Sequence, residues 1–204
     1  MSLEQELKLV VNSDDKVDLS SLVWPNEIHC SECEDIHLIS VYYDTPNLHL
    51  LKQGLGLRLR KSGDDWLQTV KTSGIVKNGL HQRDEWEHEL EAKQWDLDKL
   101  KQTPIANVIN DAQQWANIKP LFTTDFVRQI LLISVPDGST VELAYDRGHV
   151  TASEKKANIH EIELELKSGN VNSLHMLATH LFAQLDVAAS DCSKAKQGYE
   201  LASK

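Results

Sequence analysis

The 204-residue sequence lacks the marks of several common classes of protein. Its three cysteines are an odd number and too few for a disulfide framework, so we expect a reducing, cytoplasmic setting. It has no signal peptide and no apolar run long enough to span a bilayer, so we expect no membrane partner. The net charge of −10 is opposite to the basic footprint that non-specific DNA binding requires, so we expect no DNA partner.

The usual nucleotide-binding motifs are also missing. The GLGLRL segment at 54–59 lacks the GxGxxG spacing, and no Walker sequence occurs. No serine or cysteine lies in a recognisable nucleophile setting. The length fits one domain, residues 1–204, with no repeat, linker or low-complexity stretch.

One pair of cysteines could suggest a metal. Cys30 and Cys33 form a CxxC, with His29 and His37 close by in the sequence, and such residues are the usual zinc ligands. A second ligand pair is missing, because Cys192 stands alone. We therefore favour surface-loop cysteines over a zinc site, and the sequence assigns the pair no role.

Charged side chains recur at every second position. Residues 4–8 read EQELK, so in a strand Glu4, Glu6 and Lys8 share one face, and leucines occupy the other. The same alternation returns at Arg58 and Arg60, at Thr69 and Lys71, at Arg83, Glu85 and Glu87, at Glu142, Ala144 and Asp146, and at Glu161, Glu163, Glu165 and Lys167.

This alternation has two interpretations. In the first, each charged face meets water, as is usual for an antiparallel sheet with one packed face. In the second, the sheet closes into a barrel and all the charged faces point into one lumen. Buried charges are costly without partners, so such a lumen would have to bind a highly charged ligand.

Strands and helices can be placed from the same patterns. Helices are expected at 17–27, twice within 96–116 around Pro104, at 171–186 and at 192–203. Eight mostly antiparallel strands are expected at 3–11, 36–44, 55–62, 65–72, 80–91, 122–134, 139–150 and 158–167.

The order of motifs resembles the CYTH superfamily, the triphosphate tunnel metalloenzymes. The resemblance covers essentially the whole chain, and it implies an α+β fold: a closed eight-stranded antiparallel barrel with helices packed outside, the C-terminal ones at about 171–203. The matching segments are EQELK at 4–8, YYDTP at 42–46, LRLR at 57–60, TVK at 69–71, RDEWE at 83–87, Arg128, ELAYD at 142–146, ELELK at 163–167 and SKAKQGYELA at 193–202.

The resemblance also implies roles for the inward residues. Glu4, Glu6 and Glu165 would hold Mg²⁺ or Mn²⁺, which prefer hard oxygen ligands. Glu85 and Glu87 would be catalytic and would place either a second metal or the attacking water, with Glu87 orienting that water. Acids such as Glu142, Asp146, Glu161 and Glu163 would anchor basic residues through ion pairs. The substrate-binding residues would be Lys8, Arg58, Arg60, Lys71, Arg83, Arg128 and Lys194, the last closing one mouth of the tunnel.

In their amino-acid sequence, the segments GLHQR, PLFTTDF and ELELKSG are most similar to bacterial inorganic triphosphatases, in which a helical CHAD domain follows the CYTH domain. The resemblance therefore implies metal-dependent hydrolysis of tripolyphosphate to pyrophosphate and phosphate. No CHAD segment is present, which leaves open whether one followed in a longer protein. The preferred metal and the oligomeric state also stay open.

Three other functions are considered. The first is a nucleoside triphosphatase or class IV adenylate cyclase; the cyclases carry a His-Phe pair ahead of ExExK, but only three residues precede Glu4. A thiamine triphosphatase would need an aromatic platform, and neither Trp66 nor Trp86 is a convincing one. A non-catalytic polyphosphate binder could dispense with the acids of the tunnel, such as Glu6 and Glu85.

Overall fold

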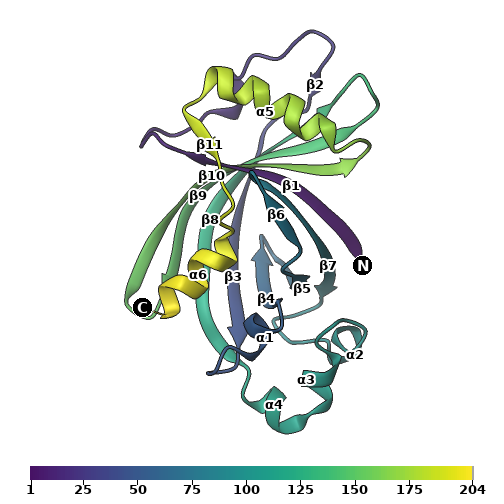
Figure 1. Cartoon of the computed structure of the whole chain (residues 1–204), viewed down its shortest axis with the longest axis vertical. Helices are drawn as coiled ribbons and strands as arrows, with labels where there is room; N and C mark the ends of the chain where they lie inside the picture. The colour runs from purple at the N-terminus through teal and green to yellow at the C-terminus, as the bar shows by residue number, and fades with distance from the viewer. Residues whose placement is uncertain (204) are drawn as a thin grey trace.

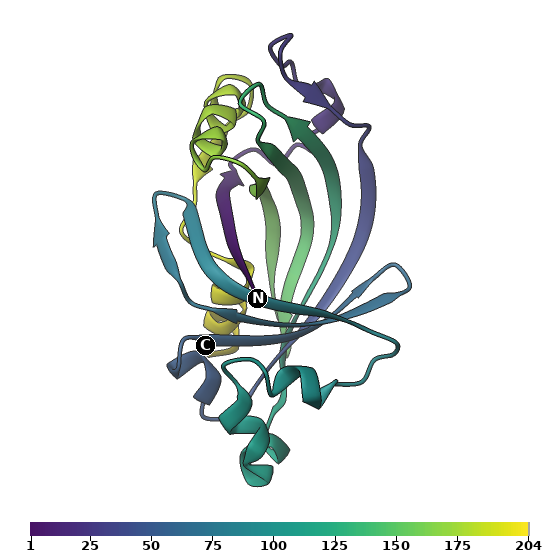
Figure 2. The ribbon, with the colours of Figure 1, turned by 90° about the vertical axis from the view of Figure 1, so that its right-hand side faces the viewer.

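In the computed structural model, which describes residues 1–203, eight long antiparallel strands close into a barrel (Figures 1 and 2). The ring order is β1-β10-β9-β8-β3-β4-β5-β7, and pairing of β7 with β1 closes it. The expected barrel is thus confirmed. The strands are β1 (Ser2–Val11), β3 (Glu34–Asp44), β4 (Leu55–Ser62), β5 (Asp65–Thr72), β7 (Leu80–Leu90), β8 (Lys119–Ser134), β9 (Thr140–Ala152) and β10 (Lys155–Ser168).

Three short strands extend this ring and were not expected from the sequence. Strand β2 (His29–Cys30) pairs with β8, β6 (Ile75–Lys77) with β7, and β11 (Val187–Ala189) with β1. Each has only two or three residues, too few for an alternating pattern to stand out. Strand β11 matters most, because it leads the chain along β1 toward the interior of the barrel.

The helix predicted at 17–27 is wrong. Only a 3₁₀ turn, η1 (Leu19–Ser21), forms there, and the Asp18 carboxylate accepts a hydrogen bond from the Ser20 N–H at its start. Beyond it, the side chain of Gln184 bonds to both the N–H (2.8 Å) and the carbonyl (2.9 Å) of Val23. These bonds from a distant helix satisfy the backbone groups that helical bonds would otherwise have paired.

Most of the helices lie at the two ends of the molecule (Figure 1). Helix α5 (Asn172–Gln184) lies at one end of the molecule, and α2 (Leu97–Leu100), α3 (Ala106–Asn110) and α4 (Ala112–Ala116) lie at the other. The 96–116 segment was predicted to form two helices but forms three short ones, since Asp111 ends α3 and caps α4. Within the described residues, no helix has both the length and the apolar character that a bilayer crossing requires.

The outward faces of the strands form the apolar core. Leu7 and Leu9 of β1, on the face opposite Glu4 and Glu6, are buried in one cluster together with Leu174, Leu177 and Leu181 of α5. A second cluster packs Leu57 and Val70 against residues of α2 and α3. The barrel is therefore stabilised largely from outside, which leaves its inner surface available for polar side chains.

Helix α6 (Lys194–Ser203) packs against residues on the inner faces of β8, β9 and β10. Its approach to Phe122 is very close: a Cβ added at Gly198 would lie 2.1 Å from the Phe122 ring. That ring is stacked on Tyr42 (4.5 Å between centroids) and meets Tyr199 edge-on (5.2 Å). Glycine at 198 therefore lets α6 reach into the barrel mouth.

We predict that Gly198→Ala destabilises the fold by roughly 1–3 kcal/mol, because the added methyl overpacks a ring held on both sides. This loss should outweigh the helix-propensity gain of about 1 kcal/mol. Urea denaturation measures the change in unfolding free energy. Gly56→Ala is the control, since nothing lies within 4 Å of its added Cβ. A Gly198→Ala variant as stable as the parent would contradict the close packing.

Candidate active site

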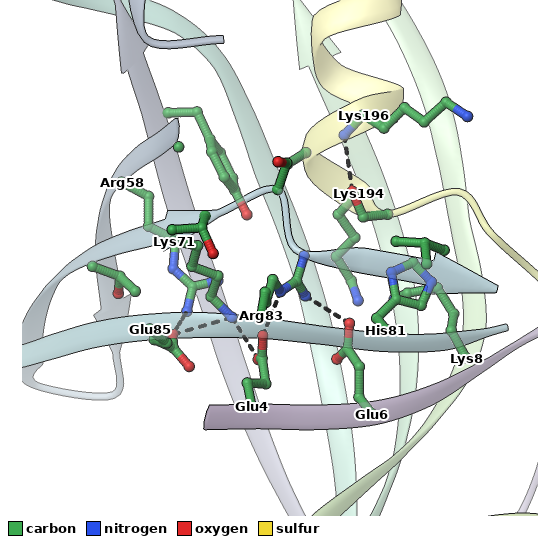
Figure 3. A pocket seen from close by; sticks show the side chains of 18 of the residues that line it. Glu4, Glu6, Lys8, Arg58, Lys71, His81, Arg83, Glu85, Lys194 and Lys196 are labelled. Carbon is green, nitrogen blue, oxygen red and sulfur yellow. Dashed lines mark hydrogen bonds and ion pairs between the residues drawn. The ribbon is translucent and has the colours of Figure 1, made fainter. Parts of the chain in front are cut away.

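The barrel encloses a cavity of about 830 Å³ whose wall is built from the inward faces of the strands and from α6 (Figure 3). The strand register brings the charged pairs of the sequence face to face: Glu6 lies opposite Glu165, Lys8 opposite Glu163, and Glu4 opposite Arg83. The cavity lining includes every predicted site residue: Glu4, Glu6, Lys8, Arg58, Arg60, Lys71, Arg83, Glu85, Glu87, Arg128, Glu165 and Lys194.

One group of ion pairs joins β1, β4, β5 and β7. Arg83 pairs with Glu4 and also reaches Glu6 at 2.6 Å. Lys71 lies 2.6 Å from Glu4 and 3.1 Å from Glu85, so it bridges two strands. Burial alone would raise the pKa of Glu4, but Lys71 and Arg83 hold that pKa far below its usual range. The carboxylate is therefore ionised at neutral pH.

Arg58 extends this group toward Glu85 and Glu87, at 3.5 and 3.3 Å. Glu87 also accepts a hydrogen bond from the Thr69 hydroxyl (2.9 Å), which orients the carboxylate. Burial would raise the pKa of Glu87, but Arg58, the Thr69 hydrogen bond and the charges of Arg60 and Lys71 together outweigh it, and the pKa is lowered. Since 39% of the Glu87 side chain is exposed, an ionised and oriented carboxylate remains accessible to water.

A second group of ion pairs is centred on Asp146, Glu161 and Glu163, whose oxygens lie within 4.8 Å of one another. Such a cluster could hold a metal, but three cations already neutralise it. Lys8 pairs with Glu161 (2.8 Å) and Glu163, and Arg128 binds both oxygens of Asp146 at 2.7 Å. The third cation, Lys194, contacts all three acids. We interpret this cluster as the ion-pair anchor of the basic residues.

The electrostatics of this second group agree with that interpretation. Burial would raise the pKa of Glu163, but Lys194, Lys8 and Arg128 hold it well below its usual value. The pKa of Lys194 is raised, because Asp146 and Glu161 outweigh the burial that would lower it. The acids and the bases therefore keep their charges inside the tunnel.

Arg60 differs from the other predicted binding residues. Its Nε donates to the Ser40 hydroxyl (2.9 Å), but within residues 1–203 it forms no ion pair with a carboxylate. Burial, together with the nearby charge of Arg58, lowers the pKa of Arg60 to about 10. Arg60 is half-buried, and a cation partly removed from water without a counterion is unfavourable, so Arg60 is prepared to receive an anion.

Glu165 shows the opposite imbalance. Burial raises its pKa; Lys167 counteracts this at 3.0 Å, while the charges of Glu4 and Glu142 add to the increase. Glu165 and Glu6 face each other on paired strands, next to Glu4. This excess of carboxylate oxygens is chemically suited to a hard divalent cation, so the predicted metal ligands fit such an ion.

His81 and Tyr42 are among the residues of the cavity wall to which the sequence assigned no role. His81 precedes Arg83, Glu85 and Glu87 with the same parity, so the alternation could have found it. Tyr42 stacks on Phe122 and also lines the cavity. Burial would raise the pKa of its phenol, and the charges of Arg58 and Arg60 lower it instead.

The CxxC cysteines lie outside this site. Cys30 is exposed on β2, Cys33 is half-buried, and both thiols are free. Burial raises the pKa of each thiol, so neither is an activated nucleophile.

Several known proteins are similar to this chain in sequence or in structure. The chain is 35% identical to the inorganic triphosphatase of Haemophilus influenzae over its full length, and it spans 56% of that relative. The solved Hippeastrum protein HpAC1, for which a dominant triphosphatase activity is described, has a TM-score of 0.65 at 16% identity and covers 97% of this chain and 95% of its own. A solved Pyrococcus horikoshii OT3 protein has a TM-score of 0.53 at 17% identity, covering 96% and 98%.

The family assignment rests on most of the chain. The CYTH domain matches residues 2–199, from the first residue of β1 to the buried Tyr199 of α6. The match thus includes all the strands of the barrel and the first part of the helix that enters it, and the chain belongs to the CYTH domain family.

Proposed function

We propose that this protein hydrolyses inorganic triphosphate to pyrophosphate and phosphate inside the tunnel. The observation that carries the proposal is a lumen containing both a half-buried guanidinium without a carboxylate partner in residues 1–203, Arg60, and an excess of carboxylates around Glu165. A polyanion satisfies the first and a divalent cation the second. The similarity to the Haemophilus influenzae inorganic triphosphatase supports this substrate.

The basic residues would bind the phosphate chain. Arginine presents a planar fork that suits phosphate oxygens, whereas lysine acts as a point charge. Arg58, Arg60 and Arg128 lie on β4 and β8, while Lys8 and Lys194 reach the tunnel from β1 and α6. Phosphate oxygens can take the place of the carboxylates as partners of these cations, so binding exchanges one set of buried ion pairs for another.

That exchange leaves carboxylates without partners, which makes metal binding a physical requirement. Glu4, Glu6 and Glu165 would hold Mg²⁺ or Mn²⁺, which when bound neutralises charge on the phosphate oxygens. Glu87, with Glu85 beside it, would orient a water for in-line attack on the terminal phosphorus. The new P–O bond forms as the bond to the bridging oxygen breaks, and pyrophosphate leaves.

The direct test measures phosphate release from tripolyphosphate, ATP and thiamine triphosphate side by side, with Mg²⁺, with Mn²⁺ and with EDTA. We expect tripolyphosphate to be the best substrate, because the described part of the lining includes no exposed aromatic side chain that could hold a base or a thiazolium. We expect EDTA to abolish turnover, because it removes the divalent cation that the proposed mechanism requires. Tight binding of tripolyphosphate with no turnover in either metal would instead identify a non-catalytic binder.

Glu87→Gln should lower kcat by about 10²–10⁴-fold, since the neutral amide cannot orient and deprotonate water as a carboxylate does. Initial rates of phosphate release measure this loss, and a thermal melt verifies folding. Asp84→Asn is the matched control, because Asp84 lies on the same strand with the opposite parity. A Glu87→Gln variant that keeps full activity would remove Glu87 from the mechanism.

Arg60→Met should raise the Tm of the ligand-free protein by about 2–4 °C, as expected for roughly 1 kcal/mol in a chain of this size. The reason is that a half-buried charge without a carboxylate partner in residues 1–203 is replaced by an apolar side chain of similar length. The same variant should lose most of the thermal stabilisation given by tripolyphosphate.

Arg58→Met is the matched control for this substitution. Arg58 neutralises Glu85 and Glu87, so its removal should lower the Tm of the ligand-free protein. Differential scanning calorimetry with and without tripolyphosphate compares the two variants. If both substitutions lower the ligand-free Tm equally, Arg60 is not the unsatisfied cation that the proposal needs.

A further inference from the structure

His81 is a buried polar residue with an unusual pattern of contacts (Figure 3). It lies opposite Glu6 on paired strands, faces the tunnel, and is only 1% exposed. Its Nε2 is 3.0 Å from the carbonyl oxygen of Ser190. A carbonyl can only accept, so Nε2 carries the hydrogen and donates it. The other ring nitrogen, Nδ1, is buried with no hydrogen-bond partner among residues 1–203.

The segment that His81 contacts connects β11 to α6. The Ser190 N–H donates to the Lys8 carbonyl (3.0 Å), and the Asp191 carboxylate accepts from the Gly79 N–H (2.7 Å). Gly79 itself lies tightly against this junction: an added Cβ would come within 2.8 Å of the Lys8 carbonyl. The chain is therefore held at the tunnel wall just before it enters the lumen.

Lys194 follows this anchored segment as the first residue of α6. It is 7% exposed, and its amine reaches Asp146, Glu161 and Glu163. The position of this buried cation depends on where the 190–193 segment leaves the wall. Two bonds hold residues 190 and 191 to the start of β7, and each uses a side chain of the cavity lining: Asp191 accepts from Gly79, and His81 donates to Ser190.

We propose that His81 is a positioning residue that sets the place of Lys194 in the tunnel through its hydrogen bond to Ser190. A histidine needed only for packing would be expected in apolar surroundings with both nitrogens satisfied. His81 instead lies among charged groups, with one nitrogen committed to the segment before α6 and the other unpartnered within the described residues. The kinetic consequence of this inference rests on the proposed function. Its structural consequence does not.

The structural consequence can be measured without turnover. An amine-acylating reagent followed by peptide mass spectrometry reports how accessible Lys194 is. His81→Phe keeps the ring but removes the donor, and we expect it to raise the acylation rate of Lys194. His81→Gln carries an amide N–H that can replace Nε2–H, and should keep Lys194 protected. His88→Leu is the control: His88 has the opposite parity on the same strand, and its substitution should leave the rate unchanged.

The kinetic consequence follows from the displacement of a charged group. We expect His81→Phe to lower kcat for tripolyphosphate by about 10–100-fold, as a misplacement of about 1 Å does, and His81→Gln to restore most of it. In a Lys194→Ala background, His81→Phe should cost little more, because both substitutions remove the same interaction. A thermal melt of each variant separates these effects from unfolding.

Several results would overturn the proposal. They are unchanged Lys194 acylation in His81→Phe, failure of His81→Gln to restore protection, or kinetic losses that add fully in the double variant. If the His81→Phe variant does not fold, His81→Asn, whose amide falls short of Ser190, takes its place in the same comparison. If the parent protein does not hydrolyse tripolyphosphate, the proposed function fails, while the acylation result still decides the role of His81.

Discussion

Mutual neutralisation of ionised side chains inside a closed barrel is the interaction on which the rest of this structure depends. Each uncompensated buried charge would cost several kcal/mol, so the lumen is tolerable only when its acids and bases are paired. Two groups of ion pairs, one around Arg83 and Glu4 and one around Lys194 and Asp146, provide that pairing without ligand. Under the proposed function, the same groups bind a polyanion once a divalent cation takes over the acids.

The two surfaces of the barrel have different roles: the outward surface packs the apolar core, and the inward surface carries the charged groups. Leucines and valines on the outward faces pack under α5 and the α2–α4 helices, and this burial holds the strands together. The inner surface carries groups that contribute little to stability or reduce it, such as Arg60 with no carboxylate partner in residues 1–203. An active site of this kind is tolerated because the core that stabilises it lies elsewhere. Helix α6 is the exception, since it packs inside the barrel and brings Lys194 into the lumen.

The eight long strands were predictable because each has one apolar and one charged face, which makes period-two alternation strong in a single sequence. The predictions from sequence failed where the local structure depends on contacts with residues far away in the sequence. Residues 22–24 form no helix; the Gln184 side chain bonds to Val23 there, and no local pattern reveals that bond. The short strand β11 was missed because its hydrogen-bond partners are supplied by β1, and the helix α1 (His49–Lys52) because four residues are too few for a helical period to stand out.

The sequence by itself determined which side chains share a face, and therefore which residues line the tunnel, because side-chain direction along a strand follows position alone. Only the tertiary structure decided which of those charges meet. Lys8 pairs with Glu163 across 155 positions, and His81 reaches Ser190 across 109. Such contacts depend on the register in which β1 joins β7 and β10, and that register is set when the whole sheet closes.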